Sequence, residues 1–138
     1  MPRTHQIVYI SYARRPMSDE ELIDLCHRSA EKNKKDGITG FLTFDGKAFL
    51  QLVEGKEPVV TALFERIKRD RRHHSIRVLF EEEGPRLLPN WHMHYEHFFR
   101  TDKTIKEILE NVAEDESLVI SGEQIKGIIG KLRFLESA

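Results

Sequence analysis

The sequence predicts an α+β sandwich built on a five-stranded mixed sheet. Short runs of alternating or continuous apolar residues predict strands at 6–12, on both sides of the dipeptide Asp45-Gly46, at 76–80 and at 91–98. Two amphipathic stretches lie between these runs and predict helices. The order βαββαββ describes a ferredoxin-like sandwich with both helices on one face of the sheet.

Composition limits the class of protein. The chain has 138 residues, of which 39% are apolar and 33% charged, enough for one domain with a core. A net charge of -1 gives no global field that favours nucleic acid or membrane. The first residues lack the apolar segment of a signal peptide, and no apolar run approaches the ~20 residues of a membrane span. With one cysteine, Cys26, no internal disulfide can form, so we expect a cytoplasmic protein.

The first strand and the first helix have clear boundaries. Residues 6–12 (QIVYISY) place Tyr9 and Ser11 on one face of a strand. Ser18 and Glu21 form a capping box, which predicts a helix that runs to about Lys35 and ends at Gly37. The apolar stripe of this helix consists of Leu22, Leu25, Cys26 and Ala30.

A hairpin from Gly37 to Gly55 carries the most informative anomaly. Asp45-Gly46 suits a tight turn because both residues tolerate positive φ. In the second strand Gln51 stands where the pattern asks for an apolar residue, and burying an unpartnered amide costs about 1–3 kcal/mol. Its neighbours on that face are Phe49 and Val53, and Leu50 and Leu52 point to the other face. Either the face of Gln51 is open to water or something polar is bound there.

The second half of the sheet follows. Pro58 lies near the first turn of a second helix, whose buried stripe is Val60, Leu63, Phe64 and Ile67. In the last strand, alternation predicts Trp91, Met93 and Tyr95 on one face.

Two further helices are predicted after the sheet. Asp102 caps the first, with Ile105, Ile108, Leu109 and Val112 on one side. Ser121 with Gln124 caps the second, with Ile125, Ile128, Ile129 and Leu132. We expect residues 99–138 to form a helical extension of the domain at 1–98, packed on the outer sheet face or in an oligomer interface.

Several kinds of active site are disfavoured by spacing. Cys26 lies on the apolar side of its helix, which is typical of a structural thiol. His92 and His94 project together but His97 projects oppositely, so no metal site is predicted. The basic run 68–74 sits at a helix end without the interleaved aromatic residues of an RNA-binding sheet.

One polar group remains to be explained. Tyr9, Ser11 and Gln51 share the helix face of the sheet, and Asn33 ends the first helix beside them. The four side chains could be a satisfied core network. They could equally be donors and acceptors of a pocket for a planar, polar-edged ring, lined by Leu25 and Ile67.

The chain from about Gln6 to Phe98 resembles the BLUF domain, a flavin-binding sensor of blue light. The resemblance rests on VYIS with Tyr9, Asn33 before GITG, FLQ-x-x-EG with Gln51, R-I-x-R-D-x-R-H from Arg66 to His73, and the W-x-M of Trp91 and Met93. These pieces occur in order, at compatible spacing, over about two-thirds of the chain.

The resemblance implies roles for individual residues. The isoalloxazine ring would lie between Leu25 and Ile67, and Gln51 would bridge Tyr9 and the flavin. In the family, light drives electron and proton transfer from the tyrosine to the flavin and leaves the glutamine rotated or tautomerised. The implied photochemical residues are Tyr9, Gln51, Trp91, Met93 and Ser11. The implied cofactor-binding residues are Leu25, Ser29, Lys32, Asn33, Phe49, Gln51, Arg66, Ile67, Asp70, Arg72 and His73.

The resemblance also sets expectations for cofactor and partners. FAD is expected, with FMN or riboflavin as alternatives, in a short stand-alone photoreceptor that turns over no substrate. Signalling would pass through a homo-oligomer and a downstream protein, without nucleic acid or membrane. Lys32 departs from the paired asparagines of many members, and Val53 replaces a leucine. The competing function is a ferredoxin-like small-molecule enzyme or carrier without photochemistry.

Overall fold

A computed structural model describes residues 3–97, 106–107, 110–111, 114–115, 117 and 119–137, with the backbone alone at 96–97 and 131–137. In chain order the elements are β1 (Thr4–Ala13), α1 (Asp19–Asp36), β2 (Thr39–Phe44), β3 (Ala48–Gly55), α2 (Glu57–Arg69), β4 (His73–Gly84), β5 (His94–His97) and α4 (Gly122–Ser137). The strands form one five-stranded sheet in the order β4-β1-β3-β2-β5. The predicted ferredoxin-like fold is confirmed.

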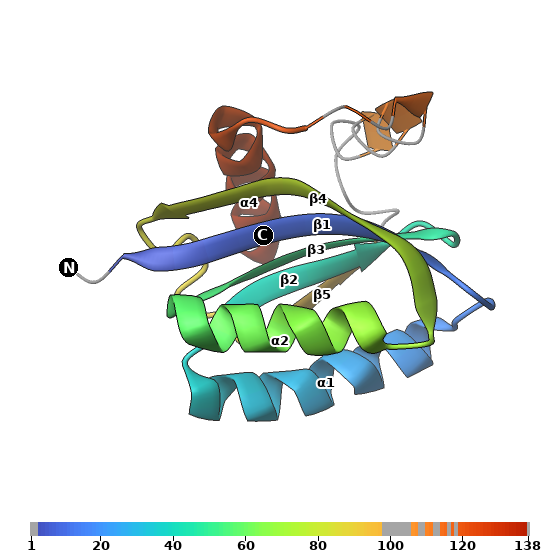
Figure 1. The fold of residues 1–138 in the computed structure, drawn as a ribbon, viewed down its shortest axis with the longest axis horizontal. Coiled ribbons are helices and arrows are strands. Elements are labelled where there is room, and N and C mark those ends of the chain that lie inside the picture. Colours follow the sequence, from blue (N-terminus) through green and yellow to red (C-terminus); the bar gives the residue numbers. More distant parts are fainter. Residues whose placement is uncertain are drawn as a thin grey trace.

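The sheet is mixed and covered on both faces. β1 pairs antiparallel with β3 and β4, whereas β2 pairs antiparallel with β3 and parallel with β5. Helices α1 and α2 lie against one face, and α4 lies against the other (Figure 1). Among the described residues, no helix has the length and apolar character needed to cross a membrane.

Local sequence signals set the ends of α1 and the hairpin turn. Ser18 Oγ accepts from the Glu21 amide at 3.2 Å, which completes the predicted capping box, and Gly37 ends the helix at a φ of 71°. In the hairpin, Gly46 alone adopts positive φ, at 100°. The Asp45 carboxylate instead accepts from the amides of Lys47 and Ala48 at 2.8 and 2.6 Å. Only one residue of the predicted dipeptide therefore needs the left-handed region.

Two hydrophobic clusters lie on opposite faces of the sheet. The inner cluster packs under α1 and α2 and includes Ile7, Tyr9, Leu22, Cys26, Phe49, Val53, Phe64 and Met93. The outer cluster includes Val8, Ile10, Leu50, Leu52, Leu79, Trp91, Ile120, Ile125, Ile128 and Ile129. The last three belong to α4, so this helix buries its isoleucines against the outer face. Burial of each isoleucine contributes about 1.5–3 kcal/mol.

The C-terminal segment is also tied to the edge of the sheet. The Ile120 amide donates to the Leu79 carbonyl of β4 at 3.0 Å, and Arg77 donates to the Asp115 carbonyl at 3.1 Å. The Ser121–Gln124 capping box is present, with hydrogen bonds of 2.8 and 3.1 Å. The cap at Asp102 and its four apolar residues lie outside the described part of the chain, and the boundary at 98/99 stays a prediction.

The segment before β5 departs from the predicted alternation. Because β5 begins only at His94, residues 91–93 form a bend, and Trp91 lies in the outer cluster while Met93 lies in the inner one. The backbone of this bend is held at two points: Gly40 donates to the Trp91 carbonyl at 2.7 Å, and Asn33 donates to the His92 carbonyl at 2.8 Å. The prediction that Trp91 and Met93 share a face is therefore wrong.

Candidate functional site

A pocket opens between α1, α2 and the inner face of the sheet. Its walls are largely apolar, and polar groups gather at its floor and at one rim. The lining residues are Tyr9, Met17, Leu25, Cys26, Ser29, Lys32, Asn33, Leu42, Phe49, Gln51, Leu63, Ile67, Asp70, Arg72, His73 and Met93. An apolar cavity with a few convergent polar groups is typical of a cofactor site.

The floor of the pocket is a pair of polar side chains on neighbouring strands. Tyr9 of β1 and Gln51 of β3 are cross-strand partners, and the Tyr9 hydroxyl donates to Gln51 Oε1. This bond orients the amide, whose Nε2 then faces the Met93 sulfur at 3.3 Å. A thioether is a weak acceptor, so the amide nitrogen keeps capacity to bond a stronger acceptor in the pocket.

Tyr9 is held as a neutral donor. Its side chain is 3% exposed, and burial raises its pKa far above the usual value, with smaller contributions from Asp70 and Cys26. The Phe64 ring packs against it with centroids 5.4 Å apart. A buried phenol needs a hydrogen-bond partner, and Gln51 supplies it.

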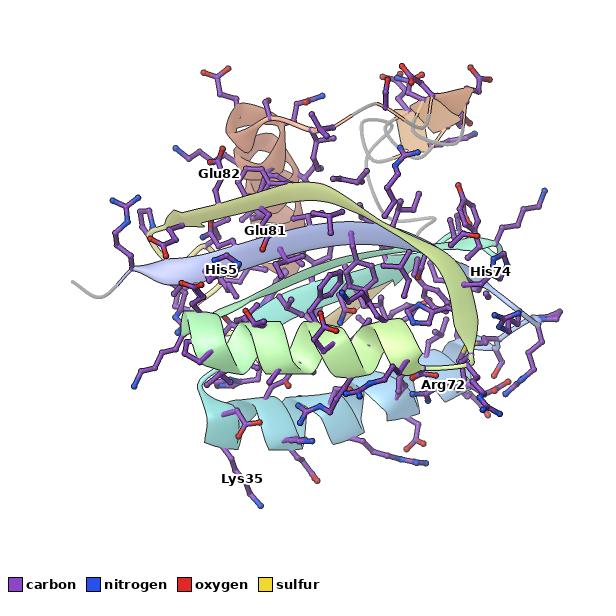
Figure 2. The ribbon with its side chains drawn as sticks, viewed as in Figure 1. His5, Lys35, Arg72, His74, Glu81 and Glu82 are labelled. Atoms are coloured by element: carbon purple, nitrogen blue, oxygen red, sulfur yellow. The ribbon has the colours of Figure 1, made fainter. Side chains whose placement is uncertain are left out.

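The rim of the pocket carries charge at the end of α2. Arg72 Nε lies 3.0 Å from both carboxylate oxygens of Asp70, and Arg72 also lies at that end of the helix in Figure 2. The hydrogen bond from Arg72 lowers the pKa of Asp70, and the same bond raises the pKa of Arg72. Both groups are charged at neutral pH, so the rim presents a guanidinium already oriented by a carboxylate.

His73 is fixed in one tautomer beside this rim. Its Nε2 lies 2.6 Å from the Ile67 carbonyl, which can only accept, so Nε2 carries the proton. The Ser11 hydroxyl, 2.7 Å from Nδ1, then donates to that nitrogen. Ser11 is fully buried and does not line the pocket, so its part is to orient the histidine ring.

Most of the residues implied by the resemblance converge on the pocket, and three do not. Ser11 lies behind His73, Arg66 is exposed on α2 away from the lining, and Trp91 lies in the outer cluster. Tyr12 packs against the outer cluster, on the face opposite Tyr9.

Four lining residues were missed by sequence reasoning. They are Met17, Cys26, Leu42 and Leu63. A signal existed for two of them, since Leu63 lies on the predicted stripe of its helix and Leu42 is the cross-strand partner of Gln51. Burial raises the pKa of Cys26 to about 12, which keeps the thiol protonated, in agreement with a structural role.

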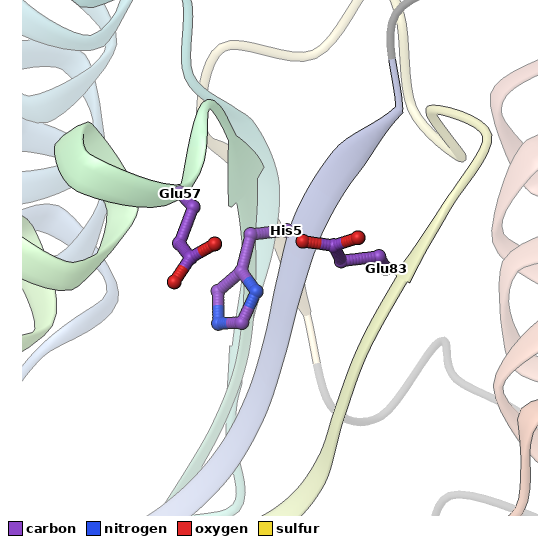
Figure 3. A group of neighbouring side chains, drawn as sticks. All are labelled: His5, Glu57 and Glu83. Atoms are coloured by element: carbon purple, nitrogen blue, oxygen red, sulfur yellow. The ribbon is translucent and has the colours of Figure 1, made fainter.

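A second group of ionisable residues lies outside the pocket. His5 of β1, Glu57 of α2 and Glu83 of β4 place possible metal-ligand atoms within 4.8 Å of one another (Figure 3). Both carboxylates are exposed, and His5 Nε2 is already 2.7 Å from Glu81. None of these residues lines the pocket. The group is an acidic surface cluster around one histidine, and we assign it no metal.

Comparison with known proteins assigns the chain to a family. A profile of the BLUF family, described as sensors of blue-light using FAD, matches residues 4–94. The chain belongs to the BLUF family. Photoactivated adenylate cyclase subunit alpha of Euglena gracilis is 33% identical over 115 residues, which is 78% of this chain and 11% of that protein. The blue light- and temperature-regulated antirepressor BluF of Escherichia coli (strain K12) is 35% identical over 66 residues, which is 48% of this chain and 16% of that protein.

Solved structures of BLUF proteins resemble this chain over more of its length. The dark-state structure of the BLUF protein BlrB superposes with a TM-score of 0.72 at 25% identity and covers 96% of both chains. The photo-activated state of BlsA has a TM-score of 0.72 at 26% identity and covers 94% of both. A bacterial light-regulated adenylyl cyclase matches with a TM-score of 0.72 at 30% identity, over 80% of this chain and 34% of its own. This chain thus spans only a small part of its cyclase relatives.

The residues of the pocket fit the FAD of this family. Apolar side chains of both α1 and α2 line it, which suits contact with a flat tricyclic ring. The floor offers an amide with unused donor capacity, and the lining includes the cations Lys32 and Arg72. The donor set is therefore suited to a ring with polar edges and an anionic tail.

Proposed function

We propose that the pocket holds the isoalloxazine ring of FAD between Leu25 and Ile67, and that Gln51 is the element that blue light switches. The hydrogen bond from the buried Tyr9 hydroxyl to Gln51, at the floor of an apolar pocket, carries this proposal. When bound, the flavin supplies absorption of blue light and the capacity to accept an electron.

The protein's own part is to hold one proton donor and one rotatable amide against that ring. Tyr9 stays protonated because it is buried, so its O–H is directed at Gln51. Rotation of the Gln51 amide exchanges its oxygen and nitrogen, which reverses its contacts with Tyr9 and Met93. Met93 belongs to the bend at 91–93, so the change can reach Trp91 and the outer cluster. This is a two-state switch biased by a local hydrogen-bond change.

Two cations in the lining support FAD over flavins that lack a diphosphate. Lys32 and Arg72 line the pocket, and cationic side chains favour an anionic tail. Denaturing the purified protein and separating the released flavin should give FAD. Release of riboflavin alone would contradict a role of Lys32 and Arg72 in binding a phosphate-bearing tail.

The test of the switch is optical. We expect a yellow protein whose flavin band shifts to longer wavelength under blue light and returns in the dark. Tyr9→Phe and Gln51→Leu should retain flavin and lose the normal shift, because each removes one partner of the Tyr9–Gln51 hydrogen bond. Tyr12→Phe, on the opposite face, is the matched control and should behave as the wild type. A normal photocycle in either inner-face variant would refute the assignment.

The signalling output is part of the same proposal. We propose a cytoplasmic photoreceptor that assembles with copies of itself and passes the light state to a downstream protein. Burial of the α4 isoleucines on the sheet supports a path from Gln51 to the outer face. Size-exclusion chromatography at micromolar concentration, in light and dark, tests the assembly, and a monomer in both conditions would contradict it. A small-molecule enzyme or carrier, the competing function, would show no light-induced shift.

A further inference from the structure

Glu54 is a fully buried carboxylate that the proposed switch does not use. It lies on β3 three residues after Gln51, and its cross-strand partners are Gln6 and Thr39. A buried carboxylate requires hydrogen-bond donors, because isolated burial of such a group costs several kcal/mol. The donors of Glu54 come from three separate parts of the chain.

The carboxylate accepts four hydrogen bonds, none from a charged group. Oε1 accepts from Gln6 Nε2 at 3.2 Å and from the Leu87 amide at 2.8 Å. Oε2 accepts from Thr39 Oγ1 and from the Leu88 amide, both at 2.8 Å. Two of these donors are backbone amides of the loop that leads to the bend at 91–93. Glu54 therefore determines where that loop lies on the sheet.

The contacts continue into a closed circuit that contains Trp91. The Trp91 amide donates to the Leu88 carbonyl at 3.2 Å, and the Trp91 carbonyl accepts from the Gly40 amide at 2.7 Å. Gly40 follows Thr39, which returns to Glu54 Oε2. Both backbone polar groups of Trp91 are thus bonded within a ring of contacts that closes at one carboxylate.

The circuit is tightly packed at Gly40, where no larger residue fits. A Cβ at Gly40 would lie 2.0 Å from the Leu52 carbonyl oxygen and 3.3 Å from Met93 Cε. The strands at Gly40 and the Met93 side chain are therefore in close contact. Met93 in turn accepts from Gln51 Nε2. A change in the circuit at Glu54 reaches the Gln51 amide through the backbone from Trp91 to Met93 and then through the Met93 sulfur.

We propose that Glu54 is a positioning residue of the light response: through the loop at 87–88 it holds Trp91 outward and Met93 against Gln51, and so sets the lifetime of the light state. This inference rests on the proposed function. For the dark state to return, Gln51 has to rotate back past the Met93 sulfur. A bend that is held less firmly yields more easily to that rotation, so weakening the circuit shortens the lifetime.

The test compares Glu54→Gln with Glu82→Gln in the flavin-loaded protein. Glu54→Gln keeps the shape but turns one acceptor into an NH₂ donor that faces a backbone or hydroxyl donor. Glu82 is exposed on the edge strand β4 and does not bond Glu54, so its variant removes a carboxylate charge but none of the four hydrogen bonds to Glu54. We expect Glu54→Gln to keep its dark spectrum and its red shift, and to recover about threefold to tenfold faster than wild type.

Trp91 provides a second readout that a purely structural role would not produce. It is the single tryptophan of the chain, so its fluorescence reports on the bend alone. The difference between light and dark emission should grow in Glu54→Gln and stay as in wild type in Glu82→Gln.

A pair of variants at Thr39 keeps the proposal testable should Glu54→Gln fail to fold. Thr39→Val removes one donor to the carboxylate and should also speed recovery, whereas Thr39→Ser keeps the hydroxyl and should recover as the wild type. Unchanged or slower recovery in Glu54→Gln and Thr39→Val, in a protein that otherwise cycles normally, would overturn this inference alone. A wild type without a red shift would overturn the proposed function itself.

Discussion

Strand β3 carries two polar side chains, three residues apart, on opposite faces of the sheet. Glu54 is fully buried, and each of its two oxygens accepts two hydrogen bonds. Gln51 has one strong partner, the Tyr9 hydroxyl, and one weak one, the Met93 sulfur. A fully bonded buried group is held in one arrangement, whereas an amide with one weak partner is held less firmly.

The two faces of the sheet also differ in how completely they are packed. The outer face is closed by α4, and its cluster is apolar apart from the Glu54 network beside it. The inner face leaves a pocket in the middle of its core, at the expense of packing that α1 and α2 could otherwise make with the sheet. Stability should therefore depend mainly on the outer face, and spectral behaviour on the inner one.

The largest effect is expected where the faces meet, at Gly40. Gly40→Ala places a Cβ 2.0 Å from the Leu52 carbonyl oxygen, so β2 and β3 must separate. We expect a loss of about 3 kcal/mol or more, or no folded protein. Urea denaturation provides the measurement. Gly127→Ala in α4, where an added Cβ meets nothing within 4 Å, is the control and should be stabilising by a few tenths to about 1 kcal/mol.

The next prediction compares one substitution on each face of the sheet. Ile125 of α4 is 2% exposed, and Ile125→Ala should lower the free energy of unfolding by about 2–4 kcal/mol. The dark spectrum and the affinity for flavin should stay unchanged. Leu25→Ala, in the pocket wall, should do the reverse, with a small loss of apoprotein stability and a large loss of flavin affinity. Equal loss of flavin in both variants would show that the two faces are not independent.

Alkaline pH tests how the protonation of Tyr9 contributes to stability. The folded state keeps the Tyr9 proton, while the unfolded chain loses it near pH 10.0, so the folded state binds more protons above that pH. The stability contribution of Tyr9 is complete below pH 10 and falls as pH rises, by up to about 1.4 kcal/mol per pH unit. Denaturation curves of wild type and Tyr9→Phe between about pH 9 and 11 measure this term. Parallel slopes would mean that Tyr9 ionises in the folded state.

The smallest effect concerns the rim. Arg72 lowers the pKa of Asp70, so the pair contributes stability above the ordinary pKa of 3.8, and this is lost as pH falls through the folded value. Asp70 is 30% exposed and Arg72 53%, so Asp70→Asn should cost only a few tenths of a kcal/mol near neutral pH. The difference from wild type should shrink as pH falls below 3.8 and the Asp70 carboxylate takes up its proton. A loss that persists there would point to a role of Asp70 in backbone structure at the end of α2.

Sequence reasoning was most successful where the signal was local. The order of strands and helices, the capping box at Ser18 and the alternation around Gln51 each depend on residues a few positions apart, and each is found in the structure. The pocket could be inferred because a polar residue interrupts a regular pattern.

The parts that could not be predicted depend on distant contacts. Trp91 leaves the face of Met93 because Gly40 and Asn33 hold the backbone of the bend, and neither interaction leaves a trace in the pattern around 91–93. Glu54 appears in the sequence as an ordinary charged residue of a strand. Its burial becomes visible only when the loop at 87–88 folds over it.

The tie between Ile120 and Leu79 has a consequence for how copies of this chain can meet. β4 is an edge strand of the sheet, and an exposed edge offers its free amides and carbonyls to the strand of another molecule. Here the Leu79 carbonyl already accepts from the chain's own C-terminal segment. A second copy that added a strand along β4 would have to displace that segment. Self-association that leaves the fold intact therefore cannot use the edge of β4 at Leu79.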